Sequence, residues 1–220
     1  MHNTLVNLIE IKKKIQLKMN NQIGINTPPK IIAVSKTHFM SNILPLINYG
    51  HLHFGENKVQ EAIDKWTEIK SKNEDIKLHL IGPLQTNKVK FVVEIFDYIH
   101  SVDREKLAIK IADEQIKQRK KIKIFIQINI ANEEQKSGIK KEQASDFFDF
   151  CKELNLDVIG TMCIPPKEGN SQDYFLEMNK INKKLNLSDL SMGMSDDYLN
   201  ATENNATFLR IGSKIFGPRN

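Results

Sequence analysis

Lys36 is the residue whose type and position most clearly suggest chemistry. It directly follows the apolar segment 31–35, whose letters are IIAVS, so it stands where a buried strand should end. In partly desolvated surroundings a lysine favours its ammonium form less, and its pKa falls. The neutral amine can then attack an aldehyde and form a Schiff base. From its position alone, the alternative is that the Lys36 ammonium simply reaches solvent from the strand end.

A second group of residues, close to the end of the chain, suggests phosphate binding. Arg210, Ile211, Gly212 and Ser213 follow one another at the end of an apolar segment, which the chain leaves through the glycine. Backbone N–H groups exposed at such a turn, or at a short helix after it, can hold a phosphate. Ser195, which we expect to open a helix, can add a hydroxyl donor. The alternative is a tight turn with a capping serine.

The sequence does not indicate other kinds of catalytic site. No Ser/His/Asp set, carboxylate pair or metal-binding spacing appears among the residues expected at the strand ends. His51 and His53 could chelate a metal, but no third ligand accompanies them, so we expect one to pack and one to lie at the surface. Cys151 and Cys163 lack CxxC spacing, and Cys163 is expected to be a small buried residue.

The elements that must position these residues repeat along the chain. Each short apolar or β-branched run is followed by an amphipathic stretch with helical periodicity. Strands are expected over residues 31–35, 52–55, 78–82, 98–102, 122–130, 158–164, 190–194 and 207–211. Helices are expected over residues 42–48 (with Ser41 as N-cap), 58–70, 87–96, 103–119, 141–154, 174–185 and 196–203. An extra helix, containing Leu5, Leu8, Ile9 and Ile15, is expected before the first strand.

Eight strand–helix units predict an α/β protein of one domain spanning residues 1–220. The expected fold is a single (β/α)8 TIM barrel with an extra N-terminal helix. A doubly wound open sheet is the alternative. Such a sheet usually has fewer strands and a glycine-rich turn after the first strand, and no GxGxxG occurs here.

A closed barrel brings the two groups of candidate residues together. Function in such barrels lies at the C-terminal ends of the strands, and the first and last strands meet at the closing seam. Lys36 and the turn at Gly212 and Ser213 should therefore be neighbours, with Arg210 between them. An amine, a phosphate cradle and a guanidinium that donates to a ring nitrogen without protonating it suit a phosphorylated aromatic aldehyde. Pyridoxal 5′-phosphate (PLP) is such a compound.

The composition is that of an ordinary globular chain, with 220 residues, 25.3 kDa, 40% hydrophobic and 27% charged residues. No apolar run is long enough for a membrane helix, and residues 1–20 lack the apolar centre of a secretory signal. We therefore expect a cytoplasmic protein that does not bind membranes. The net charge is +5, but basic and acidic residues are interspersed, so nucleic-acid binding is not expected.

The sequence also resembles a known family, the pyridoxal phosphate homeostasis proteins, which share the barrel of bacterial alanine racemases. The resemblance covers nearly the whole chain, and several of its segments are long and unusual. These segments are IIAVSKTH around Lys36, HFGENKVQE from His53, LHLIGPLQTNKVK from Leu78, HSVDREKLA from His100, IQINIANEEQKSGI from Ile126, GTMCIPP from Gly160, LSMGMSDDYLNA from Leu190 and FLRIGSKIFGPR from Phe208.

The resemblance implies that PLP is bound as an aldimine to Lys36. The resemblance also implies that Arg210 faces the pyridine nitrogen and leaves it unprotonated, which makes the ring a poorer electron sink. Gly212 and Ser213 are implied to bind the phosphate through backbone N–H groups, with Ser195 assisting. No metal is expected, because no metal-ligand spacing appears in the sequence.

Two further contacts and one departure also follow from the resemblance. Asn57, at the end of the second strand, is expected to contact the cofactor, and Met194 is a weaker candidate. The family usually has Gly-Ser-Thr before the final strand, where this chain has Asn205, Ala206 and Thr207. Asparagine tolerates a positive φ better than most residues, so the turn should survive. The hydroxyl at position 206 is lost.

We expect a binding protein rather than a racemase. Racemisation needs proton transfer on both faces of the substrate, and alanine racemases draw a second base from a partner subunit and carry a further β-domain. Here the chain ends at Asn220, after the expected barrel, and Tyr198, the tyrosine nearest a strand end, is expected to pack inside a helix. The expected function is storage, buffering or delivery of PLP, by a monomer, with PLP-dependent apoenzymes as partners and no catalytic residue. A small PLP-dependent amino-acid racemase or lyase is the alternative.

Overall fold

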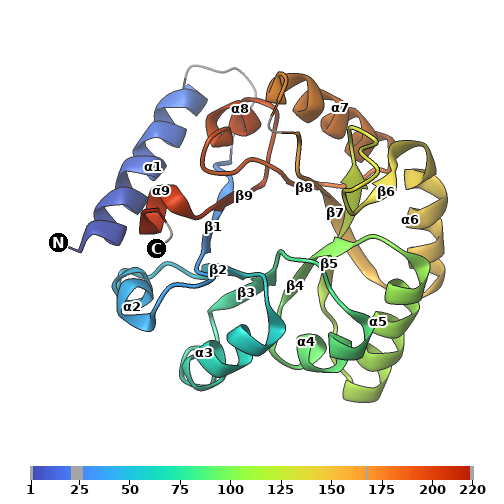
Figure 1. Cartoon of the computed structure of the whole chain (residues 1–220), viewed down its shortest axis with the longest axis horizontal. Coiled ribbons are helices and arrows are strands. Elements are labelled where there is room, and N and C mark those ends of the chain that lie inside the picture. Colours follow the sequence, from blue (N-terminus) through green and yellow to red (C-terminus); the bar gives the residue numbers. More distant parts are fainter. Residues whose placement is uncertain (1, 21–26, 167, 219–220) are drawn as a thin grey trace.

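The computed structural model describes residues 2–20, 27–166 and 168–218 of the chain. Of the domain predicted over residues 1–220, Met1, residues 21–26, Lys167, Arg219 and Asn220 lie outside the described residues. The described part has a central ring of strands with helices around its outside (Figure 1).

The ring is a closed barrel of eight parallel strands, as the sequence predicts. It closes where β9 pairs with β1, with Ile32 opposite Arg210 and Ala33 opposite Ile211. A further strand, β6 (Ile139–Lys140), pairs with β5 outside the ring and is too short to be predicted from sequence. The strands of the ring are β1 (Lys30–Val34), β2 (His53–Glu56), β3 (Lys77–Leu80), β4 (Tyr98–Val102), β5 (Lys123–Asn129), β7 (Asp157–Cys163), β8 (Asp189–Ser191) and β9 (Phe208–Ile211).

The helices alternate with the strands and cover the outside of the barrel. Two of them are preceded by 3-10 turns, Thr86–Lys88 before α4 and Lys141–Gln143 before α6. The helices are α1 (Asn3–Asn20), α2 (Met40–Asn48), α3 (Val59–Lys72), α4 (Val89–Ile95), α5 (Glu105–Gln118), α6 (Ala144–Glu153), α7 (Ser171–Lys184), α8 (Tyr198–Glu203) and α9 (Ser213–Phe216).

Several predicted boundaries are wrong by two or more residues, and three of them have a local backbone reason. Helix α2 begins at Met40 because the extended residue Phe39 is its N-cap, so Ser41 lies inside the helix. Strand β8 ends at Ser191, three residues before the predicted end at 194, and Gly193 then takes a positive φ of 86° that turns the chain. Helix α8 begins at Tyr198 with Asp197 as N-cap, so Ser195 lies in the preceding turn and does not open the helix.

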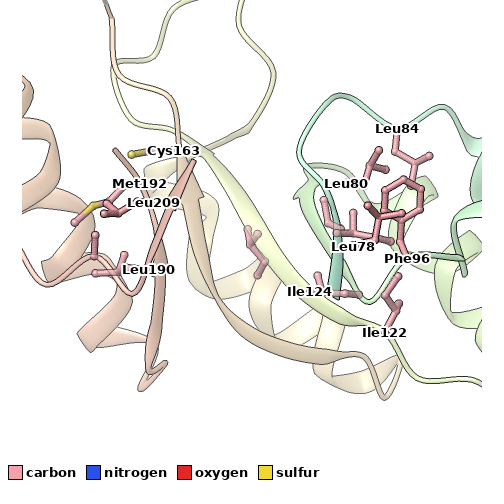
Figure 2. Close-up of a cluster of buried hydrophobic side chains, with 14 of the residues drawn as sticks. Leu78, Leu80, Leu84, Phe96, Ile122, Ile124, Cys163, Leu190, Met192 and Leu209 are labelled. Carbon is pink, nitrogen blue, oxygen red and sulfur yellow. The ribbon is translucent and has the colours of Figure 1, made fainter. Parts of the chain in front are cut away.

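Alternation along the strands divides the hydrophobic core into two layers. Residues that point outward pack against the helices and form the larger layer. Figure 2 shows two groups of this outer layer, one around Leu78, Leu80 and Ile124 and one around Leu190 and Leu209. Residues that point inward fill the barrel and form a separate smaller cluster, namely Ile32, Tyr98, Phe125, Met162 and Phe208.

The N-terminal helix α1 extends the outer layer beyond the barrel repeat. It packs against α2, α8 and α9, and it lies beside α9 in Figure 1. The expected helix is present, and within it Leu8 and Ile15 are buried whereas Leu5 and Ile9 are partly buried. Asn7 donates from Nδ2 to the Ile215 carbonyl at 2.9 Å, so α1 holds the end of α9 directly.

We predict that the inner cluster contributes strongly to stability. Phe208 is fully buried and its ring contacts those of Tyr98 and Phe125, so Phe208→Ala should lower the free energy of unfolding by about 3–5 kcal/mol. Urea unfolding measures this loss. The control Phe39→Ala, at a side chain that is 81% exposed, should change it by less than about 0.5 kcal/mol. Equal losses for both variants would contradict the role of the inner cluster.

Candidate functional site

Lys36 lies at the mouth of the barrel, at the C-terminal end of β1. Ile32 points into the barrel, and Lys36 lies in the turn that follows β1, two residues after Val34. The side chain is partly buried. Val34 pairs with Gly55, and Lys36 and Asn57 each lie two residues beyond this pair.

Both peptide groups that flank Lys36 are held by side chains of α3. Lys65 donates from Nζ to the Ser35 carbonyl at 2.9 Å, and the Thr37 N–H donates to Glu61 Oε1 at 2.5 Å. Thr37 has a left-handed backbone with φ of 65°, an uncommon conformation for a β-branched residue. Because the backbone is fixed on both sides, the direction in which Lys36 leaves the strand is fixed as well.

Glu56 supports this strand end from outside the barrel. Its carboxylate is completely buried against α3, where Oε1 accepts hydrogen bonds from Ser35 Oγ at 2.7 Å and from Trp66 Nε1 at 2.9 Å. Lys65 Nζ lies 3.0 Å from the same oxygen and neutralises it. Sequence alone could not decide which way Glu56 faces. The structure shows that it stabilises the β1–β2 edge from the side away from the barrel interior.

Arg210 is a buried cation inside the barrel. Its side chain donates from NH1 to Ser191 Oγ at 2.7 Å and from NH2 to the Cys163 carbonyl at 2.7 Å. Both acceptors are neutral, and burial lowers the pKa of Arg210 from its usual value. A guanidinium nevertheless stays protonated in proteins, and these two bonds use two of its five N–H donors. The site therefore holds a positive charge in desolvated surroundings.

The turn after β8 and the start of α9 meet beside Arg210. The Arg210 N–H donates to the Gly193 carbonyl at 2.9 Å, which joins this turn to β9. Ser195 Oγ is buried and accepts from the Lys214 N–H at 3.4 Å. Gly212 precedes α9, and a Cβ at this position would lie 3.4 Å from Val34 Cβ. Ser195, Gly212 and Ser213 are thus gathered next to the end of β1, as the sequence predicts.

Asn57 and the weaker candidate Met194 lie at the same end of the barrel. Asn57 follows β2, and its backbone lies close to Gly82. A Cβ at position 82 would lie only 2.5 Å from the Asn57 carbonyl oxygen. Glycine is therefore required at 82 for Asn57 to sit where it does. Met194 is partly buried in the turn after β8, and its N–H donates to Asp197 Oδ1 at 2.6 Å.

The other residues singled out from sequence have structural roles. His51 is buried, as expected for one of the two, and its Nε2 lies 2.9 Å from the His53 carbonyl, while His53 is only partly buried and its Nδ1 lies 2.9 Å from His79 Nε2. Within the described ranges no group of three or more His, Cys, Asp or Glu could hold a metal ion. Cys163 is fully buried as expected, and burial raises the pKa of its thiol to about 12. Tyr198 is buried in the outer layer, also as expected.

Sequence reasoning missed a row of histidines that ends at Arg210. His53 Nδ1 lies 2.9 Å from His79 Nε2, and His79 Nδ1 lies 2.9 Å from His100 Nε2. His100 Nδ1 in turn lies 2.8 Å from Ser191 Oγ, the acceptor of Arg210. In the sequence, His79 and His100 appear only as single histidines within apolar strands, in the segments LHL and YIHSV.

Comparison with known proteins agrees with this fold. The family described as "Alanine racemase, N-terminal domain" matches residues 6–220. A pyridoxal phosphate homeostasis protein of Pasteurella multocida is 34% identical over 227 residues, covering 97% of this chain and 96% of that protein. Another, from Aquifex aeolicus, is 38% identical over 200 residues, covering 86% and 87%.

Solved structures extend the comparison. PipY of Synechococcus elongatus PCC7942, with PLP bound, is 31% identical with a TM-score of 0.79, covering 92% of this chain and all (100%) of that chain. An alanine racemase of Clostridium difficile 630 shares the fold at 14% identity, with a TM-score of 0.74, and this chain spans 57% of its length.

The fold and the site define a barrel of the alanine racemase N-terminal class. Within that class, this chain belongs to the family of pyridoxal phosphate homeostasis proteins. In the part of the chain that the structure describes, no helix is long and apolar enough to cross a membrane.

The buried histidines predict that the protein loses stability in acid. Burial lowers the pKa of His51 to about 3 and that of His53 to about 4, and it holds the pKa of His79 and His100 well below 6.5. Unfolding exposes these groups, so the unfolded chain binds more protons once the pH falls below about 6.5. Their contribution is complete above that pH and is lost as the pH falls toward 4.

Urea unfolding at several pH values between about 7 and about 4.5 measures this effect. The free energy of unfolding should fall by up to roughly 1.4 kcal/mol per pH unit for each histidine that must gain a proton. In His79→Phe, which leaves one such group fewer, the dependence should be shallower. A free energy of unfolding that does not change over this range would contradict the assignment.

Proposed function

We propose that this chain binds PLP as a Schiff base on Lys36 and serves PLP homeostasis by storing, buffering or delivering the cofactor. The observation that carries the proposal is that a lysine follows the end of β1 while a buried guanidinium lies on its paired strand β9, toward the same end of the barrel. Support comes from the family and from PipY, a family relative whose structure has PLP bound.

The residues present fit each part of the cofactor. The Lys36 amine suits the aldehyde, and the remaining N–H donors of Arg210 suit the lone pair of a pyridine nitrogen. Ser195 Oγ and the Gly212 and Ser213 N–H groups, beside the end of β1, suit the phosphate. Asn57 and Met194 would complete the wall around the ring. When bound, PLP supplies an aldehyde that condenses with a primary amine and releases water.

Each protein group has a definite task in this site. Lys36 binds the cofactor covalently, and the bonds from Lys65 and Glu61 to the flanking peptides hold the backbone from which its side chain leaves. Arg210 donates to the ring nitrogen but does not give up its proton, so the nitrogen stays unprotonated. A ring in that state withdraws electrons weakly, which favours holding the cofactor over amino-acid chemistry.

We propose that the protein has no robust catalytic activity of its own and acts as a cytoplasmic monomer with PLP-dependent apoenzymes as partners. The names of its relatives, which describe homeostasis and no reaction, support a carrier. The burial of Tyr198 also supports a carrier, because this tyrosine, the first residue of α8, is packed in the outer layer of the core. A small amino-acid racemase remains the alternative that the second experiment below tests.

The proposed Schiff base makes a testable prediction about Lys36. Purified protein incubated with PLP should absorb visible light, and borohydride reduction should fix the cofactor to the peptide that contains Lys36, as detected by mass spectrometry. Lys36→Ala should show no fixed cofactor, whereas the control Lys72→Ala, at an exposed lysine of α3, should be labelled like the wild type. Cofactor fixed at another lysine, or none fixed in the wild type, would refute the assignment.

The second prediction separates carrier from catalyst. Amino acids incubated with the PLP-loaded protein in deuterated water should keep their α-protons, because the unprotonated ring stabilises a carbanion poorly. Proton NMR follows the α-proton signal over time. Exchange at the rate of an ordinary enzyme, on the order of 1 per second or faster, would establish the racemase or lyase alternative.

A further inference from the structure

A continuous line of hydrogen bonds crosses the barrel interior from Arg210 to the opposite end. Ser191 comes from β8, His100 from β4, His79 from β3 and His53 from β2, so four strands contribute one member each. His53 opens β2, at the end of the barrel away from Lys36, and is the member that is only partly buried. His79 and His100 are fully buried.

Donor and acceptor chemistry gives this line a direction. Arg210 can only donate, so Ser191 Oγ accepts from it. The Ser191 hydroxyl proton then needs an acceptor, and of its two partners only His100 Nδ1 can accept. A buried hydroxyl proton without a partner would cost about 1–3 kcal/mol.

The same argument continues through the imidazoles. With Nδ1 accepting, neutral His100 carries its proton on Nε2 and donates to His79 Nδ1. His79 likewise donates from Nε2 to His53 Nδ1. His53 is left with its proton on Nε2, facing the far end of the barrel. The charge of Arg210 therefore sets one tautomer in all three rings.

The surroundings keep the three imidazoles neutral. His79 stacks on Tyr98 with ring centroids 4.2 Å apart, and His100 stacks on Phe125 at 4.3 Å. The charged groups that act on the line are Lys30, Lys77 and Asp97 at His53, Lys30 and Lys70 at His79, and Arg210 at His100. Cations outnumber the one carboxylate, so a further positive charge on the imidazoles is disfavoured.

We propose that Ser191, His100, His79 and His53 form one directed hydrogen-bond chain that positions the Arg210 guanidinium for the pyridine nitrogen of the cofactor. This inference rests on the proposed function, in which Arg210 faces that nitrogen. The four residues are positioning residues, because they act through Arg210. The direction of the chain also hinders its protonation. The unprotonated Nδ1 of His53 accepts a hydrogen bond from His79, so a proton can add to this nitrogen only if that hydrogen bond breaks.

The direction of the chain is tested on the cofactor-free protein. Long-range proton–nitrogen NMR spectra at neutral pH distinguish protonated from unprotonated ring nitrogens. His53, His79 and His100 should each carry the proton on Nε2 and none on Nδ1. A proton on Nδ1 of any of the three would overturn the directed chain, and this result needs no variant and no PLP.

The positioning role is tested with Ser191→Ala, which removes the link between Arg210 and the histidines. PLP affinity, measured by absorbance titration, should weaken about tenfold, and the spectrum of the bound cofactor should become pH-dependent. Ser191→Thr keeps the hydroxyl and should restore both properties. The matched control Thr161→Val removes another buried hydroxyl, one that donates to Asn182 Oδ1 outside the barrel, and should leave both unchanged.

The outcomes separate this inference from the proposed function. Wild-type affinity and spectrum in Ser191→Ala would overturn the positioning role while leaving PLP binding intact. Equal losses in Ser191→Ala and Thr161→Val would also overturn it, because they would reflect stability alone. A wild-type protein that binds no PLP would overturn the proposed function, and the NMR tautomers would still decide whether the chain is directed.

Discussion

The buried charge of Arg210 is the constraint on which the rest of the site depends. A guanidinium taken out of water must exchange its hydration for hydrogen bonds, or the fold loses several kcal/mol. The structure supplies neutral acceptors from two other strands, the Ser191 hydroxyl of β8 and the Cys163 carbonyl of β7. These bonds hold β7, β8 and β9 together at the mouth. A group that brings a lone pair to the remaining N–H donors would satisfy the charge further.

Strand alternation lets the same short strands serve both stability and chemistry. Outward-facing residues such as Leu78 and Leu209 pack under the helices, and inward-facing residues such as Phe208 fill the barrel. At the mouth, the inward face carries Arg210 and Lys36 follows the end of β1, while the outward face carries Ser35 and Glu56, which tie the strand end to α3. The backbone on both sides of Lys36 is thus supported by a polar network on the outward side of the strand end.

Much of the fold and site could be predicted from the sequence because the relevant patterns are local. The eight apolar runs marked the eight strands of the barrel, and the residues after them marked the mouth. Asn205 does adopt the expected left-handed backbone, with φ of 64°, so the turn before β9 survives without glycine. The roles of the individual site residues toward PLP stay predictions.

What could not be predicted depends on contacts between distant parts of the chain. In the sequence His79 and Ser191 look like ordinary strand residues. Only the folded barrel brings them into one hydrogen-bonded line with Arg210. The support of Lys36 by Lys65 and Glu61 depends on the angle at which α3 crosses β1 and β2. Helix starts at Phe39 and Asp197 depend on backbone angles that residue type specifies weakly.

The measurement that tests the account most directly is the nitrogen NMR spectrum of the protein loaded with PLP that carries a nitrogen-15 label in its ring. The account predicts an unprotonated ring nitrogen that accepts a hydrogen bond, over the whole pH range in which the protein is folded. Arg210→Ala should shift that signal toward a nitrogen that takes up a proton. A protonated ring nitrogen in the wild type at neutral pH would contradict the account.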